Sequence, residues 1–262
     1  MATLVCFHAH PDDESMTTGG TIARAVAEGH RAVLVVATRG EHGEVPEDLA
    51  AGETLADRRV AETMRSAEVL GISRVEFLGY SDSGMDGWHQ NNEPDSFWQA
   101  PVDVAAERLA AILREESAEV LTVYDPHGNY GHPDHIQVHR VGHRAAELAG
   151  TPVVYEATMN RDAMQRLVQM AAELAPELDI DPPEMPEDME FGMPEAALTT
   201  AIDVSGFIAQ KRESITMHAS QVTDSSFFLR MPPEAFATAF STEWFIRRGA
   251  PPGIHEHSLA GL

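Results

Sequence analysis

Short apolar runs alternate with longer segments of helical periodicity along the first 160 residues of this chain. Such alternation predicts repeated β-α-β units, whose right-handed crossovers produce a parallel sheet covered by helices. We therefore predict an α/β fold. The expected strands are Thr3–Phe7, Arg31–Thr38, Arg74–Leu78, Val120–Tyr124 and Thr151–Ala157, and the expected helices are Thr17–Glu28, Glu53–Leu70, Val102–Glu115 and Asp134–Ala149.

The remainder, residues 161–262, predicts less regular elements within the same single domain, 1–262. We expect strands at Leu198–Val204 and Glu243–Arg247, with a helix at Gly206–Ala219 between them. An acidic, Pro-rich stretch at about 173–197 lies in a part of the chain that has no Lys or Arg between Arg166 and Lys211. We predict an exposed insertion there, and a lid is the alternative.

The composition excludes several classes of partner. With 18 Lys+Arg against 42 Asp+Glu, the net charge of −24 disfavours nucleic acid and anionic membranes. Cys6 is the only cysteine, so an intrachain disulfide or a thiolate-rich zinc site is excluded and any metal must bind His and carboxylate. The apolar run Ala32–Ala37 is too short to cross a bilayer, and we predict a cytoplasmic protein, which could form a homo-oligomer.

Several common catalytic motifs are absent from the sequence. It contains no Gly-x-Gly-x-x-Gly and no P-loop, so the sheet is not predicted to bind a dinucleotide or a nucleoside triphosphate there. The Gly-x-Ser-x-Gly elbow of serine hydrolases and the His-Glu-x-x-His of zincins are also missing.

Clusters of polar side chains follow the first and fourth predicted strands. They span 8–14 and 125–135, and both start where an apolar strand ends. Because the carboxyl ends of parallel strands meet at one edge of a sheet, the two clusters are expected to converge. Buried carboxylates would repel one another there unless a cation supplied the opposite charge. Polar residues that only cap loops and helices are the alternative.

Histidine and carboxylate ligands suit Zn²⁺, and Fe²⁺ would fit them as well. Three protein ligands with an open position define a catalytic site, where bound water reaches a pKa of about 7. A carboxylate must then stay off the metal to accept the proton. Adjacent Asp12 and Asp13 project differently from an irregular loop, so one can bind metal while the other faces water.

The two polar clusters contain the motifs His10-Pro11-Asp12-Asp13-Glu14 and His132-Pro133-Asp134-His135. By these motifs the chain resembles the LmbE-like/PIG-L zinc N-deacetylase family over most of its length. The family fold is a Rossmann-like α/β domain. The resemblance implies that His10, Asp13 and His135 bind zinc and that Asp12 is the general base. It further implies a protonated His132 that stabilises the oxyanion or protonates the amine, Tyr130 as a partner of the tetrahedral intermediate, and Asp134 as the group that orients an imidazole, expected to be that of His132.

Shorter segments resemble the actinobacterial branch of this family that acts in mycothiol metabolism. They are Phe7-His8-Ala9, Asp82-Ser83-Gly84-Met85 and Tyr130-Gly131-His132. By this resemblance Arg59 and Asp82 bind sugar hydroxyls. The alternative for Arg59 is an ion pair with Glu62 on an exposed helix face.

Other histidines and acidic residues have less specific positions. His139 and His143 follow His135 at helical spacing and could extend the metal site, but a position deeper along the helix is the favoured prediction. His8 is expected in the core or behind the ligands. His218 is predicted to have a structural role or to touch substrate, and Glu41 and Glu44 to be rim contacts or solvated charges.

Together these features predict a zinc-dependent N-deacetylase that hydrolyses an acetamido group of a small N-acetylglucosaminyl compound to amine and acetate. An amidase of the same family that cleaves a larger conjugate is the nearest alternative. A catalytically idle sugar-binding or metal-binding module is a further alternative, disfavoured because Asp12 and every expected ligand are present.

Overall fold

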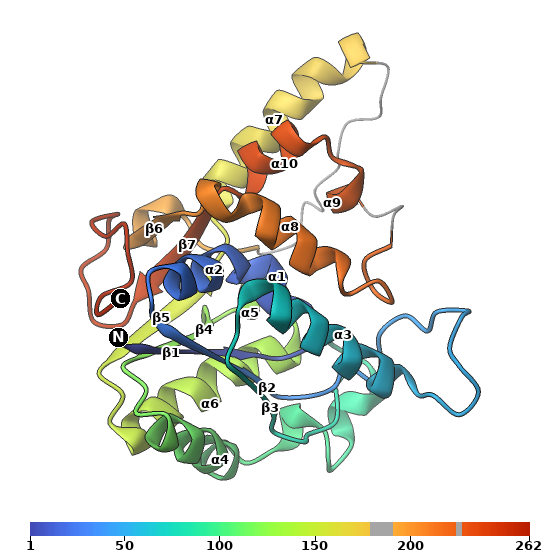
Figure 1. Ribbon diagram of the computed structural model, residues 1–262, viewed down its shortest axis with the longest axis vertical. Helices are drawn as coiled ribbons and strands as arrows, with labels where there is room; N and C mark the ends of the chain where they lie inside the picture. Colours follow the sequence, from blue (N-terminus) through green and yellow to red (C-terminus); the bar gives the residue numbers. More distant parts are fainter. Residues whose placement is uncertain (179–190, 224–226) are drawn as a thin grey trace.

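A seven-stranded sheet with the order β3-β2-β1-β4-β5-β7-β6 forms the centre of the molecule in the computed structural model, which describes residues 1–178, 191–223 and 227–262 (Figure 1). The strands are β1 (Thr3–His8), β2 (Arg31–Val36), β3 (Arg74–Phe77), β4 (Val120–Tyr124), β5 (Val153–Thr158), β6 (Thr200–Asp203) and β7 (Thr242–Arg247). Strands β1 to β5 are parallel, as predicted, whereas β7 runs antiparallel to both β5 and β6. The α/β class is confirmed, and the C-terminal strands extend the same sheet.

Helices cover both faces of this sheet. The α-helices of the described residues are α1 (Asp13–Thr17), α2 (Gly19–Ala27), α3 (Leu55–Leu70), α4 (Val102–Glu115), α5 (Gly128–Gly131), α6 (Pro133–Ala149), α7 (Arg161–Leu178), α8 (Ile208–Thr216), α9 (Phe227–Arg230) and α10 (Pro233–Phe240). Figure 1 shows α4 and α6 on one face and α2 and α3 on the other. Each face has its own apolar core, one around Phe7, Leu109 and Val141 and the other around Leu4 and Ile22. Apolar side chains on both faces explain the continuous apolar runs of the parallel strands.

The predicted helix Thr17–Glu28 is wrong at its start, because a break at Thr18 separates α1 from α2. The carboxylate of Glu243 on β7 accepts hydrogen bonds from the backbone N–H groups of Gly20 and Thr21, both at 2.8 Å. A carboxylate at a helix N-terminus satisfies donors that have no partner within the helix. Glu243 also pairs with the buried amine of Lys211 at 2.6 Å, so a residue from the far end of the chain fixes where α2 begins.

Helix α3 begins at Leu55 because Thr54 and Asp57 form a capping box. The Thr54 hydroxyl accepts from the Asp57 N–H, and the Asp57 carboxylate accepts from the Thr54 N–H, each at 3.1 Å. At its other end, Gly71 adopts φ 74°, a left-handed conformation that glycine accepts without steric cost.

Thr54→Ala is expected to lower the free energy of unfolding by about 1 kcal/mol, because it removes the N-cap acceptor of α3. Chemical denaturation measures this change. Thr238→Ala is the matched control, since its exposed hydroxyl bonds the Glu234 carbonyl within α10 and caps no helix. Equal stability of Thr54→Ala and the unsubstituted protein would contradict the capping argument.

The C-terminal part contains more helix than the sequence predicted. Helix α7 was not predicted, and it includes the first residues of the expected acidic insertion. Residues 179–190 of that insertion lie outside the described residues, so the insertion and lid interpretations stay predictions. Across the described ranges, no helix is both long and apolar enough to cross a membrane.

Candidate active site

Strands β1 and β4 are neighbours at the centre of the sheet, and each leads directly into one of the two polar clusters. The chain leaves β1 toward the face covered by α2 and leaves β4 toward the face covered by α6. Ligands bind at such a switch point, beyond the carboxyl ends of the strands, in open α/β sheets. The two polar clusters therefore converge at this edge of the sheet, as predicted.

Three side chains predicted as metal ligands meet at this edge. The His135 Nε2 lies 3.3 Å from the His10 Nδ1 and 3.4 Å from the Asp13 Oδ2. The remaining edge of the triangle, from the His10 Nδ1 to the Asp13 Oδ2, is 3.5 Å. Donors about 2.0–2.1 Å from a tetrahedral ion stand roughly 3.3 Å apart, so this triangle has the size of three zinc ligands. The two nitrogens and one carboxylate oxygen fit a divalent metal of intermediate softness, such as Zn²⁺. His10 also belongs to two other groups of possible metal ligands, one with His132 and His135 and one with Asp82 and Asp134.

The other ring nitrogen of His10 is held by carboxylates. The His10 Nε2 lies 3.2 Å from the Asp134 Oδ2 and 3.5 Å from the Asp82 Oδ1. Burial alone would lower the pKa of His10, but the carboxylates of Asp82, Asp13 and Asp134 hold it well above its ordinary value. The side chain of Asp134 thus contacts His10, and the expectation that it orients His132 is wrong. A carboxylate behind a ligating imidazole fixes the direction of the ring and its tautomer.

Asp12 occupies a strained backbone position beside this triangle. Its φ of 98° is unusual for a residue with a side chain, and such strain persists only where the surroundings enforce it. Its N–H donates to the Glu14 carboxylate at 3.1 Å, and its Oδ2 accepts from the Arg59 guanidinium at 3.3 Å. Burial raises the pKa of Asp12 to about 6, with Arg59 acting against the rise and Asp13 adding to it.

A buried network fixes Glu14 and, through it, the Asp12 loop. Glu14 accepts from Ser66 at 2.6 Å and pairs with the His218 Nε2 at 2.7 Å. Burial alone would raise the pKa of Glu14, but His218 lowers it to about 2. Of the two roles predicted for His218, the structure shows the structural one, since its ring pairs with buried Glu14.

His132 and Tyr130 line the same site from the α5–α6 junction. The His132 Nδ1 accepts the Asp134 backbone N–H at 3.1 Å, which makes His132 the N-cap of α6. Burial, together with His10 and His135, lowers the pKa of His132 to about 2. Because the Nδ1 accepts a hydrogen bond, the proton of a neutral His132 ring is on Nε2. The protonated form of His132 that the resemblance implies for the reaction stays a prediction. The Tyr130 hydroxyl lies 3.4 Å from the His135 Nε2.

Arg59 and Asp82 both lie at the site, where several of their polar atoms already bind protein groups. Arg59 is buried and donates to the Gly40 and Pro11 carbonyls at 2.9 and 2.6 Å. The alternative of an exposed Arg59–Glu62 pair is wrong, because Glu62 is buried as well and accepts from Ser220. The carboxylate of Asp82 accepts from the backbone N–H groups of residues 84 and 42 at 2.8 and 3.2 Å.

Three further histidines, His8, His139 and His143, are not corners of the triangle. His8 is buried between the Tyr124 hydroxyl and Thr18, at 2.7 and 2.9 Å, which is the core position expected for it. His139 and His143 lie further along α6, where both face Glu156 of β5.

Glu41 and Glu44, which lie between β2 and α3, differ in their surroundings. The Glu41 carboxylate accepts the Asp82 N–H at 3.2 Å and so belongs to the rim of the site. Glu44 is exposed, and only its backbone is bound, by Gln221.

The sequence reasoning missed Ser83 and Tyr124. Ser83 donates to Asp134 through its backbone N–H at 2.9 Å and through its hydroxyl. The ring of Tyr124 stacks on the ring of His135, with centroids 4.4 Å apart. Two sequence signals could have identified them: Ser83 directly follows Asp82, and Tyr124 is the last residue of β4, directly before the second polar cluster.

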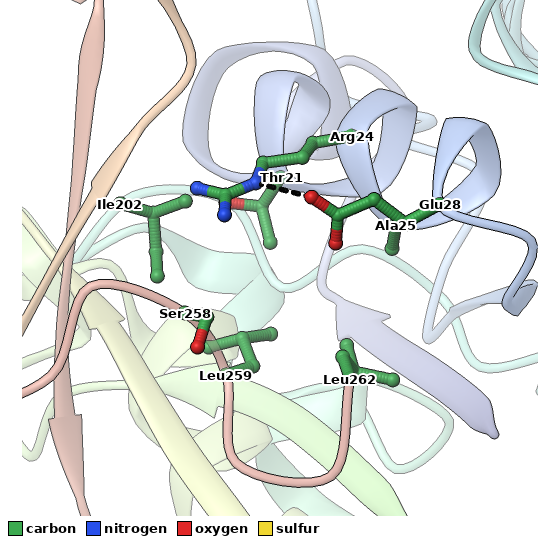
Figure 2. A pocket seen from close by; sticks show the side chains of 8 residues that line it. All are labelled: Thr21, Arg24, Ala25, Glu28, Ile202, Ser258, Leu259 and Leu262. Carbon is green, nitrogen blue, oxygen red and sulfur yellow. Dashed lines mark hydrogen bonds and ion pairs between the residues drawn. The ribbon is translucent and has the colours of Figure 1, made fainter.

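A small hollow between α2 and the C-terminal segment lies apart from this chemistry (Figure 2). Its volume is about 20 Å³, and its walls include the exposed ion pair Arg24–Glu28 at 2.9 Å. No residue of either polar cluster lines it, so it is not a candidate for catalysis.

Fold and site together define a class of protein: a Rossmann-like α/β protein with imidazole and carboxylate donors at the ligand-binding edge of its sheet. Residues 5–146 match the family model described as PIG-L, GlcNAc-PI de-N-acetylase. The chain belongs to the PIG-L family.

Similar proteins cover nearly the whole chain. A 1D-myo-inositol 2-acetamido-2-deoxy-alpha-D-glucopyranoside deacetylase of Thermobifida fusca is 43% identical over 240 residues, 84% of this chain and 83% of the relative. The deacetylase 1 of the same description from Catenulispora acidiphila is 36% identical over 287 residues, 99% of this chain and 89% of the relative. The structure of N,N'-diacetylchitobiose deacetylase from Pyrococcus horikoshii shares the fold, with a TM-score of 0.59, 22% identity, and 94% of this chain and 83% of that chain covered.

Proposed function

We propose that this protein is a metal-dependent N-deacetylase that hydrolyses the acetamido group of a small N-acetylglucosaminyl compound. The observation that carries the proposal is the triangle of His10, Asp13 and His135 donors, with sides of 3.3–3.5 Å, next to the carboxylate of Asp12, which is not one of the three donors. The names of relatives that cover nearly the whole chain support the choice of deacetylation and of a glucosaminyl-inositol type of substrate.

His10, Asp13 and His135 would hold the metal, with Zn²⁺ as the first choice and Fe²⁺ as an ion that the same donors accept. When bound, such an ion polarises a carbonyl and acidifies water. The negative Asp134 and Asp82 behind the His10 Nε2 keep that ring in the orientation required of a ligand.

Asp12 is the proposed general base. Its side chain is 23% exposed, so water and substrate reach it, and its pKa of about 6 leaves the carboxylate ionised at neutral pH. It takes a proton from the attacking water, whose oxygen bonds to the acetyl carbon. The carbon–nitrogen bond then breaks, and the proton held by Asp12 passes to the departing amine.

His132 and Tyr130 are the proposed donors to the oxyanion of the tetrahedral intermediate. Because the His132 Nδ1 accepts a backbone N–H, its proton is on Nε2, and a neutral imidazole can donate from there. Burial holds the pKa of Tyr130 above its usual value, so its hydroxyl keeps the proton it would donate.

We also propose that residues 1–262 act as one domain, made of the 1–160 core and the 161–262 elements. Strand β7 of the C-terminal part pairs with β5 of the core, and Glu243 of β7 fixes the start of α2. His218 of the C-terminal part likewise supports Glu14 in the first polar cluster.

The proposed function is tested by loading the purified protein with Zn²⁺ and measuring amine and acetate release. N-acetylglucosaminyl-inositol, simple N-acetylglucosaminides and larger amide conjugates form the substrate panel. Release of amine and acetate in equal amounts from the glucosaminides is the expected result. Cleavage of the larger conjugates alone would favour the amidase, and no cleavage by the loaded protein would favour the idle binding module.

Asp82→Ala and Arg59→Ala are expected to separate substrate binding from positioning of the base. Asp82→Ala should reduce kcat/KM for an N-acetylglucosaminide by about 10–150-fold more, roughly 1.5–3 kcal/mol, than for a minimal acetamide without the ring, because it removes a sugar contact in addition to its support of His10. Arg59→Ala should reduce turnover of both substrates alike, because the guanidinium holds the Asp12 loop at the Pro11 carbonyl. Metal content is measured in parallel, and exposed Asp86→Ala is the control. Equal losses of Asp82→Ala on both substrates would remove Asp82 from the sugar site.

A further inference from the structure

A second group of metal-binding side chains lies on α6 and β5. It consists of His139, His143 and Glu156, which are half-buried, and one donor atom from each lies within 4.8 Å of the others. The two histidines are four residues apart and therefore lie on one face of the helix. None of the three takes part in the site proposed for deacetylation.

The backbone explains why Glu156 reaches this helix face. Gly142 lies on α6 between the two histidines, and a Cβ there would meet the side chain of Val123 on β4 at 2.2 Å. The absence of a side chain at Gly142 thus lets the helix approach the sheet closely. In the register of β4 and β5, Val123 is the partner of Glu156, so the carboxylate emerges beside the point of closest approach.

The contacts within the group leave nitrogen lone pairs available. The His139 Nδ1 lies 3.0 Å from the Tyr124 carbonyl oxygen, which can only accept, so the proton is on Nδ1 and the lone pair on Nε2. Burial lowers the pKa of His139, which keeps the ring neutral. A ring N–H donated to a backbone carbonyl is the usual support of a metal-ligating histidine.

We propose that His139, His143 and Glu156 form a second site for a divalent transition-metal ion of the Zn²⁺ type. Two imidazoles and one carboxylate form a common zinc donor set, and partial exposure leaves a position for water. The Glu156 Oε1 lies 2.8 Å from the His143 Nε2, and the rings of His139 and His143 have centroids 4.5 Å apart. Ligand atoms of a tetrahedral ion stand roughly 3.3 Å apart, so side-chain rotations that bring the His139 Nε2 to this pair complete the site.

Occupancy of this site joins α6 to β5. Metal binding replaces the hydrogen bond between His143 and Glu156 with three ligand bonds. An ion that binds only the folded chain raises its thermal stability. Mg²⁺ and Ca²⁺, which prefer oxygen ligands, are not expected to bind.

The test is a calorimetric titration of protein that already holds one equivalent of Zn²⁺. The unsubstituted protein is expected to bind one further equivalent of Zn²⁺, to gain thermal stability as it does so, and to show no response to Mg²⁺. His143→Ala and Glu156→Gln should weaken binding of the additional Zn²⁺ by at least ~10-fold. Removal of a group that only supports a ligand already lowers metal affinity by this factor, and removal of the ligand itself should lower it at least as much. Binding of Co²⁺ at the additional site should give visible absorption that both variants lose.

His89→Ala is the matched control, because His89 also faces a glutamate four residues away, Glu93 at 3.5 Å, but is 80% exposed. It should bind the additional Zn²⁺ like the unsubstituted protein. Glu156→Gln keeps the shape of the side chain, and circular dichroism verifies that both variants fold. Absence of a second equivalent in the unsubstituted protein, or equal additional binding in His143→Ala and Glu156→Gln, would show that these residues only hydrogen-bond α6 to β5.

Discussion

Asp12→Asn is expected to keep the metal but to lose about 10²–10⁴-fold in kcat, because an amide cannot take the proton of the attacking water. Asparagine is the substitution of choice here. Residue 12 has φ 98°, and asparagine tolerates left-handed conformations better than alanine does. The loop geometry should therefore survive, and the lost activity then reports on the missing base.

Metal content and turnover are measured on the same preparation of Asp12→Asn. Asp103→Asn serves as control, since this aspartate lies on α4 with a side chain that is 78% exposed. If Asp12→Asn carries a full complement of metal and retains near-normal turnover, Asp12 is not the base. If it loses the metal instead, Asp12 belongs among the ligands.

His10→Ala and His135→Ala are expected to abolish tight binding of the first metal equivalent and, with it, amine release. Each substitution removes one corner of the donor triangle, and even the loss of a group that supports a ligand costs about 10–100-fold in metal affinity. A metal titration and a turnover assay on each variant check this result. Binding at His139, His143 and Glu156 should persist in both variants, because neither substitution touches those donors.

Folding is the main alternative explanation for these losses. The ring of His135 stacks on the buried Tyr124, so His135→Ala removes core packing as well as a ligand. His10→Ala leaves that stack intact, and His89→Ala, at a side chain that is 80% exposed, is a control that removes a histidine elsewhere. Unchanged affinity for the first equivalent in both His10→Ala and His135→Ala would refute the proposed ligands.

The predicted elements differ in accuracy for physical reasons. The strand Val120–Tyr124 and the helix Val102–Glu115 have their predicted bounds. Their apolar periodicity and the signals that end them depend only on residues a few positions apart in the sequence. The start of α2 was mispredicted, because Glu243 fixes it from more than two hundred residues away. Helix α7 was missed because the acidic, proline-rich composition that follows it suggested an irregular segment.

The sequence by itself determined the parallel strands, the two polar clusters at their carboxyl ends and the donor types that meet there. These follow from local patterns and from the rule that parallel strands end at a common edge. Only the tertiary structure decided that Asp134 supports His10, that Arg59 is buried against the Asp12 loop, and that β7 enters the sheet antiparallel. These contacts join residues far apart in the chain, and a buried polar side chain takes whichever partner the packing brings within hydrogen-bond distance. Local sequence sets the kinds of group at the site, and the packing of distant segments decides which of them pair.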